Sequence, residues 1–301
     1  MLRLRAVDEL IVASRLVHFA AVALLFGAPL FRLAIAREHV PQGRAWELAA
    51  SAAALLSGLG WFAGVAANMA GSFADAATPD TLQAVTFDTR FGHLWIGRLI
   101  VLVAIFVVQL CWRPSRWRDG VLVLLAAGFA ASLIGVGHGM TGAGHGPVVA
   151  RIHMIADMVH LLCAAAWIGG LFCLGPLLHR VVTGRETSAT ARKALRRFST
   201  MGYWAVALVL ITGCINALVM VPRPGSLIGS DYGRVLLLKL TLVVLFVGFA
   251  IVNRVVLTPP IMAAADATGM RRLWHSVVVE QGVGILVLAA VAWLGIIHPV
   301  P

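Results

Sequence analysis

Apolar segments long enough to cross a lipid bilayer recur along the whole chain. About 18 or more predominantly apolar residues in a row are typical of a transmembrane helix. Eight such segments are present, at about residues 9–36, 47–71, 92–112, 120–138, 152–179, 199–221, 232–257 and 275–297. This pattern predicts an all-α integral membrane protein with eight transmembrane helices and no separate soluble domain.

The second half of the chain resembles the first. The aligned pairs are His18 and His160, Gly27 and Gly169, Gly92 and Gly233, Arg98 and Lys239, Gly135 and Gly295, and His138 and His298, with a weaker match of residues 55–58 to 210–213. We therefore predict two parallel four-helix repeats, residues 1–150 and 151–301, related by a pseudo-two-fold axis along the membrane normal. The small residues at Gly27 and Gly169 should let their helices approach neighbours closely.

The composition indicates a membrane protein rather than a nucleic-acid-binding one. The 301 residues have a mean hydropathy of +0.91 and 12% charged side chains, whereas soluble domains carry about 25%. Most basic residues of the +11 chain follow the first, third, fifth and seventh predicted helices, at Arg32, Arg37, Arg44, Arg113, Arg116, Arg118, Arg180, Arg185, Arg192, Lys193, Arg196, Arg197, Arg254, Arg271 and Arg272. The positive-inside rule then places both termini in the periplasm of a bacterium, with the chain in the inner membrane.

Titratable residues interrupt the apolar segments in a regular way. His153, Asp157 and His160 follow one another at steps of four and three residues, which places them on one helix face. Charged groups inside a membrane cost roughly 2.5–3.5 kcal/mol each on insertion scales, so they usually face the protein interior and mark function. Two structural alternatives remain open: a hydrogen bond between helices for each histidine, and neutralisation of Arg15 by Asp157.

Two histidines and two cations are expected to share one layer of the membrane. His18, Arg98, His160 and Lys239 each lie roughly 10–15 Å below the periplasmic ends of their helices, at 1.5 Å of rise per residue. The repetition of the histidines at aligned positions favours a ligand function for both.

The segment "GHGMTGAGHGP" (137–147) is rich in glycine and carries His138, Met140 and His145. Imidazole and thioether groups suit copper, with methionine favouring Cu(I). The alternative interpretation is a turn whose polar residues are incidental.

The segments "GHG…ADMVHLLCAAAWIGGLF" and "YGRVLLLKLTLVVLFVGFAIVNRVVLTPP" resemble the two characteristic segments of the CopD (PcoD) family of bacterial copper resistance proteins. The resemblance implies an inner-membrane protein of copper homeostasis that moves copper inward from the periplasm. It also implies a periplasmic copper carrier of the CopC type as partner. The positions that match are His138, Asp157, His160, Trp167, Gly169, Gly170, Gly233, Lys239, Asn253 and Arg254.

These observations lead to one preferred hypothesis, a copper protein without enzymatic activity. Copper is expected to enter at the periplasmic face and to continue to a site inside the membrane. The expected periplasmic ligands are His138, Met140, His145 and His153, and the expected intramembrane ligands are His18, Asp157 and His160, with His298 as an additional candidate.

Two other functions fit the same residues. A haem b-binding redox protein would use axial pairs His18 with His138 and His160 with His298, with Arg98 and Lys239 binding the haem propionates. A protein that holds copper for a periplasmic partner without transporting it is the third possibility.

Overall fold

The computed structural model describes residues 2–36, 43–136, 146–220, 226–263 and 267–297, and these residues form helices and connecting turns without a strand. Eight helices are long and apolar enough to cross a membrane, as predicted. Their cores are α1 (Leu2–Ala34), α2 (Arg44–Ala70), α5 (Arg90–Cys111), α6 (Arg116–Ala131), α7 (Pro147–Val182), α8 (Ser188–Met220), α10 (Asp231–Val252) and α12 (Ala267–Leu294).

Short helical segments extend or connect these spans. A 3₁₀ turn, Ser132–Gly135, extends α6, and the π-helical turn Asn253–Leu257 joins α10 to α11 (Thr258–Ala263). The remaining segments are α3 (Phe73–Ala76), α4 (Pro79–Gln83), the π-helical turn Ala84–Asp88 and α9 (Ser226–Gly229).

The α8 helix begins well before the predicted segment, at Ser188 rather than near residue 199. Its first three turns contain alanine, leucine, arginine and lysine, which are strong helix formers. Hydropathy alone does not reveal these turns because the basic residues lower it. Ala191, Ala194 and Leu195 are nevertheless buried, so this extension packs against the bundle.

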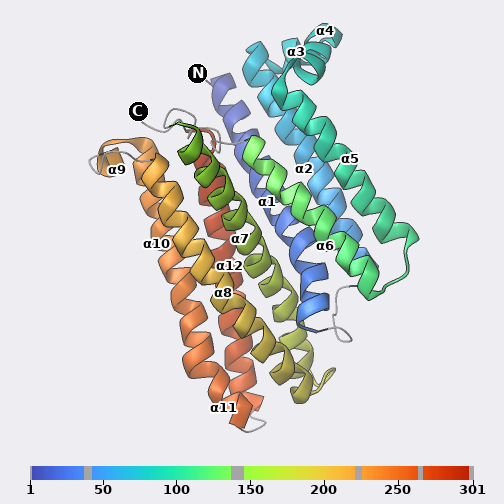
Figure 1. Cartoon of the computed structure of the whole chain (residues 1–301), viewed down its shortest axis with the longest axis vertical. Coiled ribbons are helices and arrows are strands. Elements are labelled where there is room, and N and C mark those ends of the chain that lie inside the picture. The colour runs from blue at the N-terminus through green and yellow to red at the C-terminus, as the bar shows by residue number, and fades with distance from the viewer. Residues whose placement is uncertain (1, 37–42, 137–145, 221–225, 264–266, 298–301) are drawn as a thin grey trace.

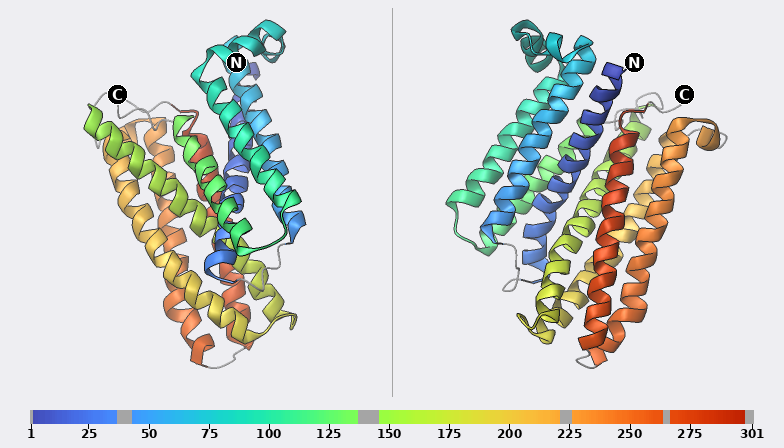
Figure 2. Two further views of the ribbon diagram at one scale, coloured as in Figure 1. Left: turned by 45° about the vertical axis from the view of Figure 1, so that its right-hand side comes forward. Right: turned by 180° about the vertical axis from the view of Figure 1, so that it is seen from behind.

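The helices form two groups that lie side by side. Figures 1 and 2 show α1, α2, α5 and α6 in one group and α7, α8, α10 and α12 in the other. The helix α1 begins and α12 ends at the same end of the bundle, which also carries α3, α4 and α9 (Figure 1). We call this the terminal end, and the opposite end, which carries α11, the α11 end. Both α1 and α7 start at the terminal end (Figure 1).

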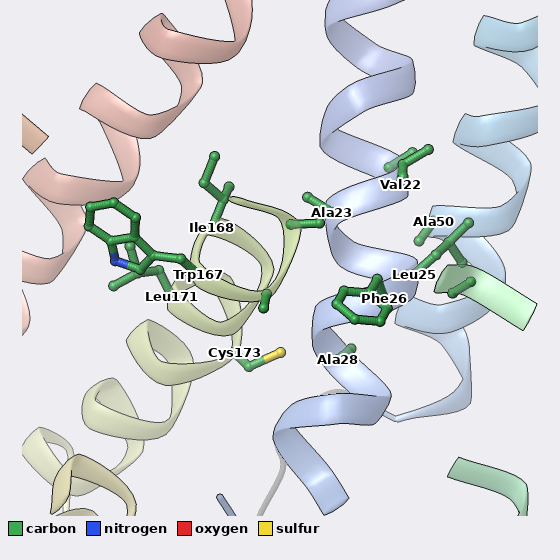
Figure 3. Close-up of a cluster of buried hydrophobic side chains, with 14 of the residues drawn as sticks. Val22, Ala23, Leu25, Phe26, Ala28, Ala50, Trp167, Ile168, Leu171 and Cys173 are labelled. Atoms are coloured by element: carbon green, nitrogen blue, oxygen red, sulfur yellow. The ribbon is translucent and has the colours of Figure 1, made fainter. Parts of the chain in front are cut away.

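The two groups meet where α1 packs against α7. A Cβ atom added to Gly27 would lie 2.6 Å from the Cα and carbonyl carbon of Gly169, and one added to Gly169 would overlap the Ala23 carbonyl oxygen. The predicted close approach at these glycines is thus confirmed, because only residues without a Cβ fit there. Phe26 and Ile168 belong to the buried cluster around this contact (Figure 3).

A buried network of charges joins three helices near the α11 end. Arg32 of α1 lies 2.5 Å from Glu47 of α2 and 2.7 Å from Asp119 of α6, and Arg118 of α6 pairs with both carboxylates. Gln109 of α5 accepts a hydrogen bond from Ser51 at 2.8 Å. Arg32 and Arg118 therefore have a structural role in addition to the orienting role predicted from their sequence positions.

Candidate functional site

His18 is completely buried on α1, where its imidazole uses both ring nitrogens. Its Nδ1 lies 3.0 Å from the Ala54 carbonyl oxygen and 3.2 Å from Ser57 Oγ, and its Nε2 lies 2.6 Å from Nη2 of Arg98. Because a guanidinium can only donate, Nε2 accepts this bond and Nδ1 carries the proton. His18 is therefore a neutral imidazole. It faces the protein interior, as predicted.

Arg98 of α5 is fixed among backbone and aromatic groups. Its Nη1 donates to the Phe129 carbonyl oxygen at 2.9 Å and to Ser132 Oγ, and the guanidinium carbon lies 4.3 Å from the Phe129 ring centroid. Only 2% of the residue is exposed. Within the described ranges no carboxylate pairs with it, so cation–π contacts and hydrogen bonds stabilise its charge.

A mostly apolar cavity of about 170 Å³ lies between α2 and α5 and reaches both His18 and Arg98. Trp95 lines the same cavity, and its ring and that of Trp61 meet the imidazole edge-on.

His160 of α7 repeats part of this arrangement in the second half. Its Nδ1 lies 3.1 Å from Thr212 Oγ1, whose hydroxyl donates to the Leu208 carbonyl oxygen at 2.5 Å. Nδ1 therefore donates to Thr212. Ser57 likewise donates to the carbonyl oxygen four residues earlier, at 2.5 Å.

The glycines that follow these hydroxyl residues also correspond. A Cβ atom on Gly58 would lie 3.5 Å from His18 Cε1, and one on Gly213 would lie 3.4 Å from His160 Cε1. The weak sequence match of 55–58 to 210–213 thus coincides with a matching pair of histidine contacts.

The two histidines differ at Nε2. Arg98 occupies Nε2 of His18, whereas the part of the chain that the structure describes offers no hydrogen bond to Nε2 of His160. His160 therefore keeps a free lone pair and His18 does not.

Asp157 lies one turn before His160 and belongs to a polar cluster between α7, α8 and α10. Asn216 Nδ2 donates to Asp157 Oδ1 at 3.1 Å. Lys239 lies close enough to Asp157 and to His160 for their charges to interact. Arg98 and Lys239, aligned in the sequence, thus each lie close to the histidine of their own half.

The alternative that Asp157 neutralises Arg15 does not hold for the described residues, since no ion pair joins them. Arg15 instead donates to the Gly295 carbonyl oxygen at 3.4 Å. Its guanidinium carbon lies 4.7 Å from the Trp61 ring centroid.

His153 lies one turn before Asp157 and is 1% exposed. Neither of its ring nitrogens has a hydrogen-bond partner among the described residues. Buried polar groups nearly always have one, so this imidazole has unused capacity to bind a ligand.

The predicted periplasmic ligands His138, Met140 and His145, together with His298, lie outside the described residues. The described residues contain no group of three or more His, Cys, Asp or Glu side chains that could hold a metal ion. The structure therefore brings Asp157, His160 and Lys239 together without forming a closed coordination sphere from described side chains.

The sequence prediction did not name several residues that orient this cluster. Asn216 follows Thr212 by four residues and thus lies on the same helix face. Ser57 and Thr212 each precede a glycine in the weakly matched segments, which was the available signal. Glu280, a carboxylate in the last apolar segment, was also not named.

Comparison with known proteins gives two family matches. The family model described as "Copper resistance protein D-like, N-terminal domain" matches residues 6–147, and "Copper resistance protein D" matches residues 192–294. No solved structure matches the chain.

Three relatives are similar over long stretches. "Inner membrane protein YebZ" of Escherichia coli (strain K12) is 32% identical over 96% of this chain and 98% of its own length. "Copper resistance protein D" of Pseudomonas syringae pv. tomato is 30% identical over 97% of each chain. "Copper transport protein CutJ" of Bacillus subtilis (strain 168) is 26% identical over 75% of this chain and 43% of its own length. With its eight apolar helices, the chain is a multi-pass inner-membrane protein that belongs to the copper resistance protein D family.

Proposed function

We propose that this protein accepts copper at the terminal end and moves it across the inner membrane along α7. The observation that carries the proposal is the polar face of α7. On it follow His153, which is buried and has no hydrogen-bond partner among the described residues, Asp157, and His160, whose Nε2 has no hydrogen bond within the described ranges. The names of two relatives, a copper resistance protein and a copper transport protein, support copper as the ion.

The spacing along α7 favours successive positions for the ion over one shared site. His153 and His160 are separated by about 10 Å along the helix axis at 1.5 Å per residue, which is too far for both to bind one ion. Copper would first meet the proposed ligands His138, Met140 and His145 and then pass to His153. It would continue to Asp157 and His160, with His298 as a further candidate at the terminal end.

The side chains of Arg98 and Lys239 determine which of the two histidines can bind copper. Asp157 offsets the charge of Lys239 beside His160, whereas the charge of Arg98 has no described carboxylate beside it. His18 can join the pathway only when Arg98 leaves its Nε2. We therefore assign the main pathway to the second half and keep His18 as a conditional ligand.

The direction of movement follows from the proposed orientation. The positive-inside rule favours a cytoplasmic location for the basic loops of the α11 end, and hence a terminal end that faces the periplasm. A periplasmic carrier of the CopC type would deliver copper there.

Haem binding is less compatible with this geometry. Both nitrogens of His18 are engaged in hydrogen bonds, so this imidazole has no free lone pair for an axial bond. A reducible Soret band in the purified protein would contradict the copper proposal. A protein that holds copper without moving it would bind the ion and fail the transport measurement below.

Copper uptake into proteoliposomes tests the pathway. The variant His160→Gln should lower the uptake rate by more than about tenfold, because even the outer partners of metal ligands typically contribute 10–100-fold. Thr212→Val, which removes the group that orients His160, should lower it by about tenfold.

The matched control is His275→Gln, since His275 is exposed on α12 and its ring lies tilted against the neighbouring Trp274 ring. This variant should transport copper like the unmodified protein. Equal uptake by His160→Gln and the control would reject the pathway.

A further inference from the structure

A second cavity lies in the other half of the protein and contains a carboxylate that the copper pathway does not use. The cavity has a volume of about 390 Å³ and is lined by residues of α7, α8, α10 and α12, among them Phe198, Val247 and Glu280. In the first half α2 packs directly on α5, whereas α8 and α10 hardly touch and the cavity lies between them. A cavity of this size has room for several water molecules, each of which takes about 30 Å³ in the liquid, and the Glu280 carboxylate and the Asn253 amide in its wall are polar groups that can bind them.

Glu280 is buried in the wall of this cavity with 2% exposure. Asn253 Nδ2 donates to its Oε2 at 2.6 Å, and Trp167 is a second hydrogen-bonding partner. Trp167 extends from α7 on the side away from α1 (Figure 3). Across the described chain no lysine, arginine or histidine forms an ion pair with Glu280.

The other titratable groups near this cavity contact residues other than Glu280. Arg254 and Tyr203 line the same cavity, but Arg254 donates to the Ser199 carbonyl oxygen at 2.8 Å and lies over the Tyr203 ring. The rings of His179 of α7 and His275 of α12 contact the Trp274 ring in tilted arrangements, and neither residue lines the cavity.

A comparison within the protein shows what Glu280 lacks. Glu47 and Asp119, the buried carboxylates of the first half, each pair with Arg32 and Arg118. An ionised carboxylate without such a partner is strongly disfavoured inside a membrane. Glu280 therefore needs its counter-charge from the cavity.

The unpaired side-chain oxygen of Asn253 favours a proton as the positive charge that neutralises Glu280. The Oδ1 atom of Asn253 is buried and has no donor among the described residues. A protonated Glu280 provides an O–H donor beside the Asn253 amide, whereas an ionised carboxylate offers only acceptors. The apolar walls of the cavity also give a metal cation few oxygen ligands.

From this geometry we propose that Glu280 is a proton-binding site that exchanges its proton with water in the cavity between α8 and α10. A hydronium ion gives its proton to a Glu280 oxygen, the O–H bond forms there, and a water molecule remains. Release is the reverse step, with a cavity water accepting the proton. The site is separate from the copper pathway, so it exists whether or not the protein transports copper.

Infrared difference spectroscopy of the full chain in copper-free lipid vesicles tests this proposal. The unmodified protein should show the C=O band of a protonated carboxylic acid that is lost reversibly as the pH rises. The band should be absent in Glu280→Gln and retained in Asp231→Asn, the variant of an exposed carboxylate on α10. A band that persists in Glu280→Gln, or no titrating band at all, overturns the proposal.

Two further variants keep the test decisive if Glu280→Gln does not fold. Asn253→Ala should shift both the band position and its titration midpoint, because the amide partner is lost; an unshifted band overturns the assignment. Ala207→Trp, which fills the cavity from α8, should slow the exchange of the carboxyl proton for deuterium. An unchanged exchange rate would show that the cavity is not the proton's route.

Discussion

At the scale of single residues, hydrogen-bond capacity separates the two histidines that the sequence aligns. Both bind a hydroxyl oxygen through Nδ1, but among the described residues only His18 has a partner at Nε2, which is Arg98. Arginine has a planar fork that reaches several acceptors at once, whereas lysine has one compact ammonium. The second half has Lys239 where the first half has Arg98, and Nε2 of its histidine, His160, has no partner among the described residues.

Replacement of Arg98 by methionine should destabilise the protein substantially. The change removes hydrogen bonds to His18, the Phe129 carbonyl oxygen and Ser132, and bonds to charged groups contribute about 1.5–3 kcal/mol each. The thermal midpoint in detergent should fall clearly. Arg98→Lys should recover only part of this loss, because it lacks the fork.

The control for this measurement is Arg234→Met, which removes a charge from an exposed pair with Asp231. Such pairs contribute about 0–1 kcal/mol, so its midpoint should stay near that of the unmodified protein. Equal midpoints for Arg98→Met and the control would show that Arg98 has no structural role.

At the scale of elements, the contact of α1 with α7 depends on glycine. The variant Gly169→Ala would place a methyl group against the Ala23 carbonyl, and overpacking typically costs about 1–3 kcal/mol. The thermal midpoint should therefore fall. Gly248→Ala is the matched control, because nothing lies within 4 Å of a Cβ added there, and it should be neutral or slightly stabilising. A neutral Gly169→Ala would mean that the helices separate without loss.

The sequence predicts some elements and contacts better than others for physical reasons. Hydropathy is averaged over many residues, so the eight transmembrane segments are predicted well. The basic residues at the start of α8 lower the hydropathy there and hide its first turns. The bond from Arg98 to His18 depends on the rotation of two helices about their axes, which periodicity alone does not define. Glu280 carries the same signal as Asp157, a charge inside an apolar segment, so its burial was predictable from the sequence.

At the scale of the whole molecule, the ends of the bundle should face different compartments. An impermeant thiol reagent applied to intact spheroplasts should label Asp80→Cys, since Asp80 is exposed on α4 at the terminal end. The native Cys111, exposed at the end of α5, should react only after lysis. The reverse pattern would invert the orientation and with it the direction proposed for copper.

The glycine contact between α1 and α7 also limits how the halves can move. Where backbone rests on backbone, no side chain can change rotamer to let one helix slide past the other. If one group of helices rotates relative to the other, we therefore expect the contact between Gly27 and Gly169 to be the pivot. Such a rotation would bring the two groups together at one end of the bundle while it separates them at the other.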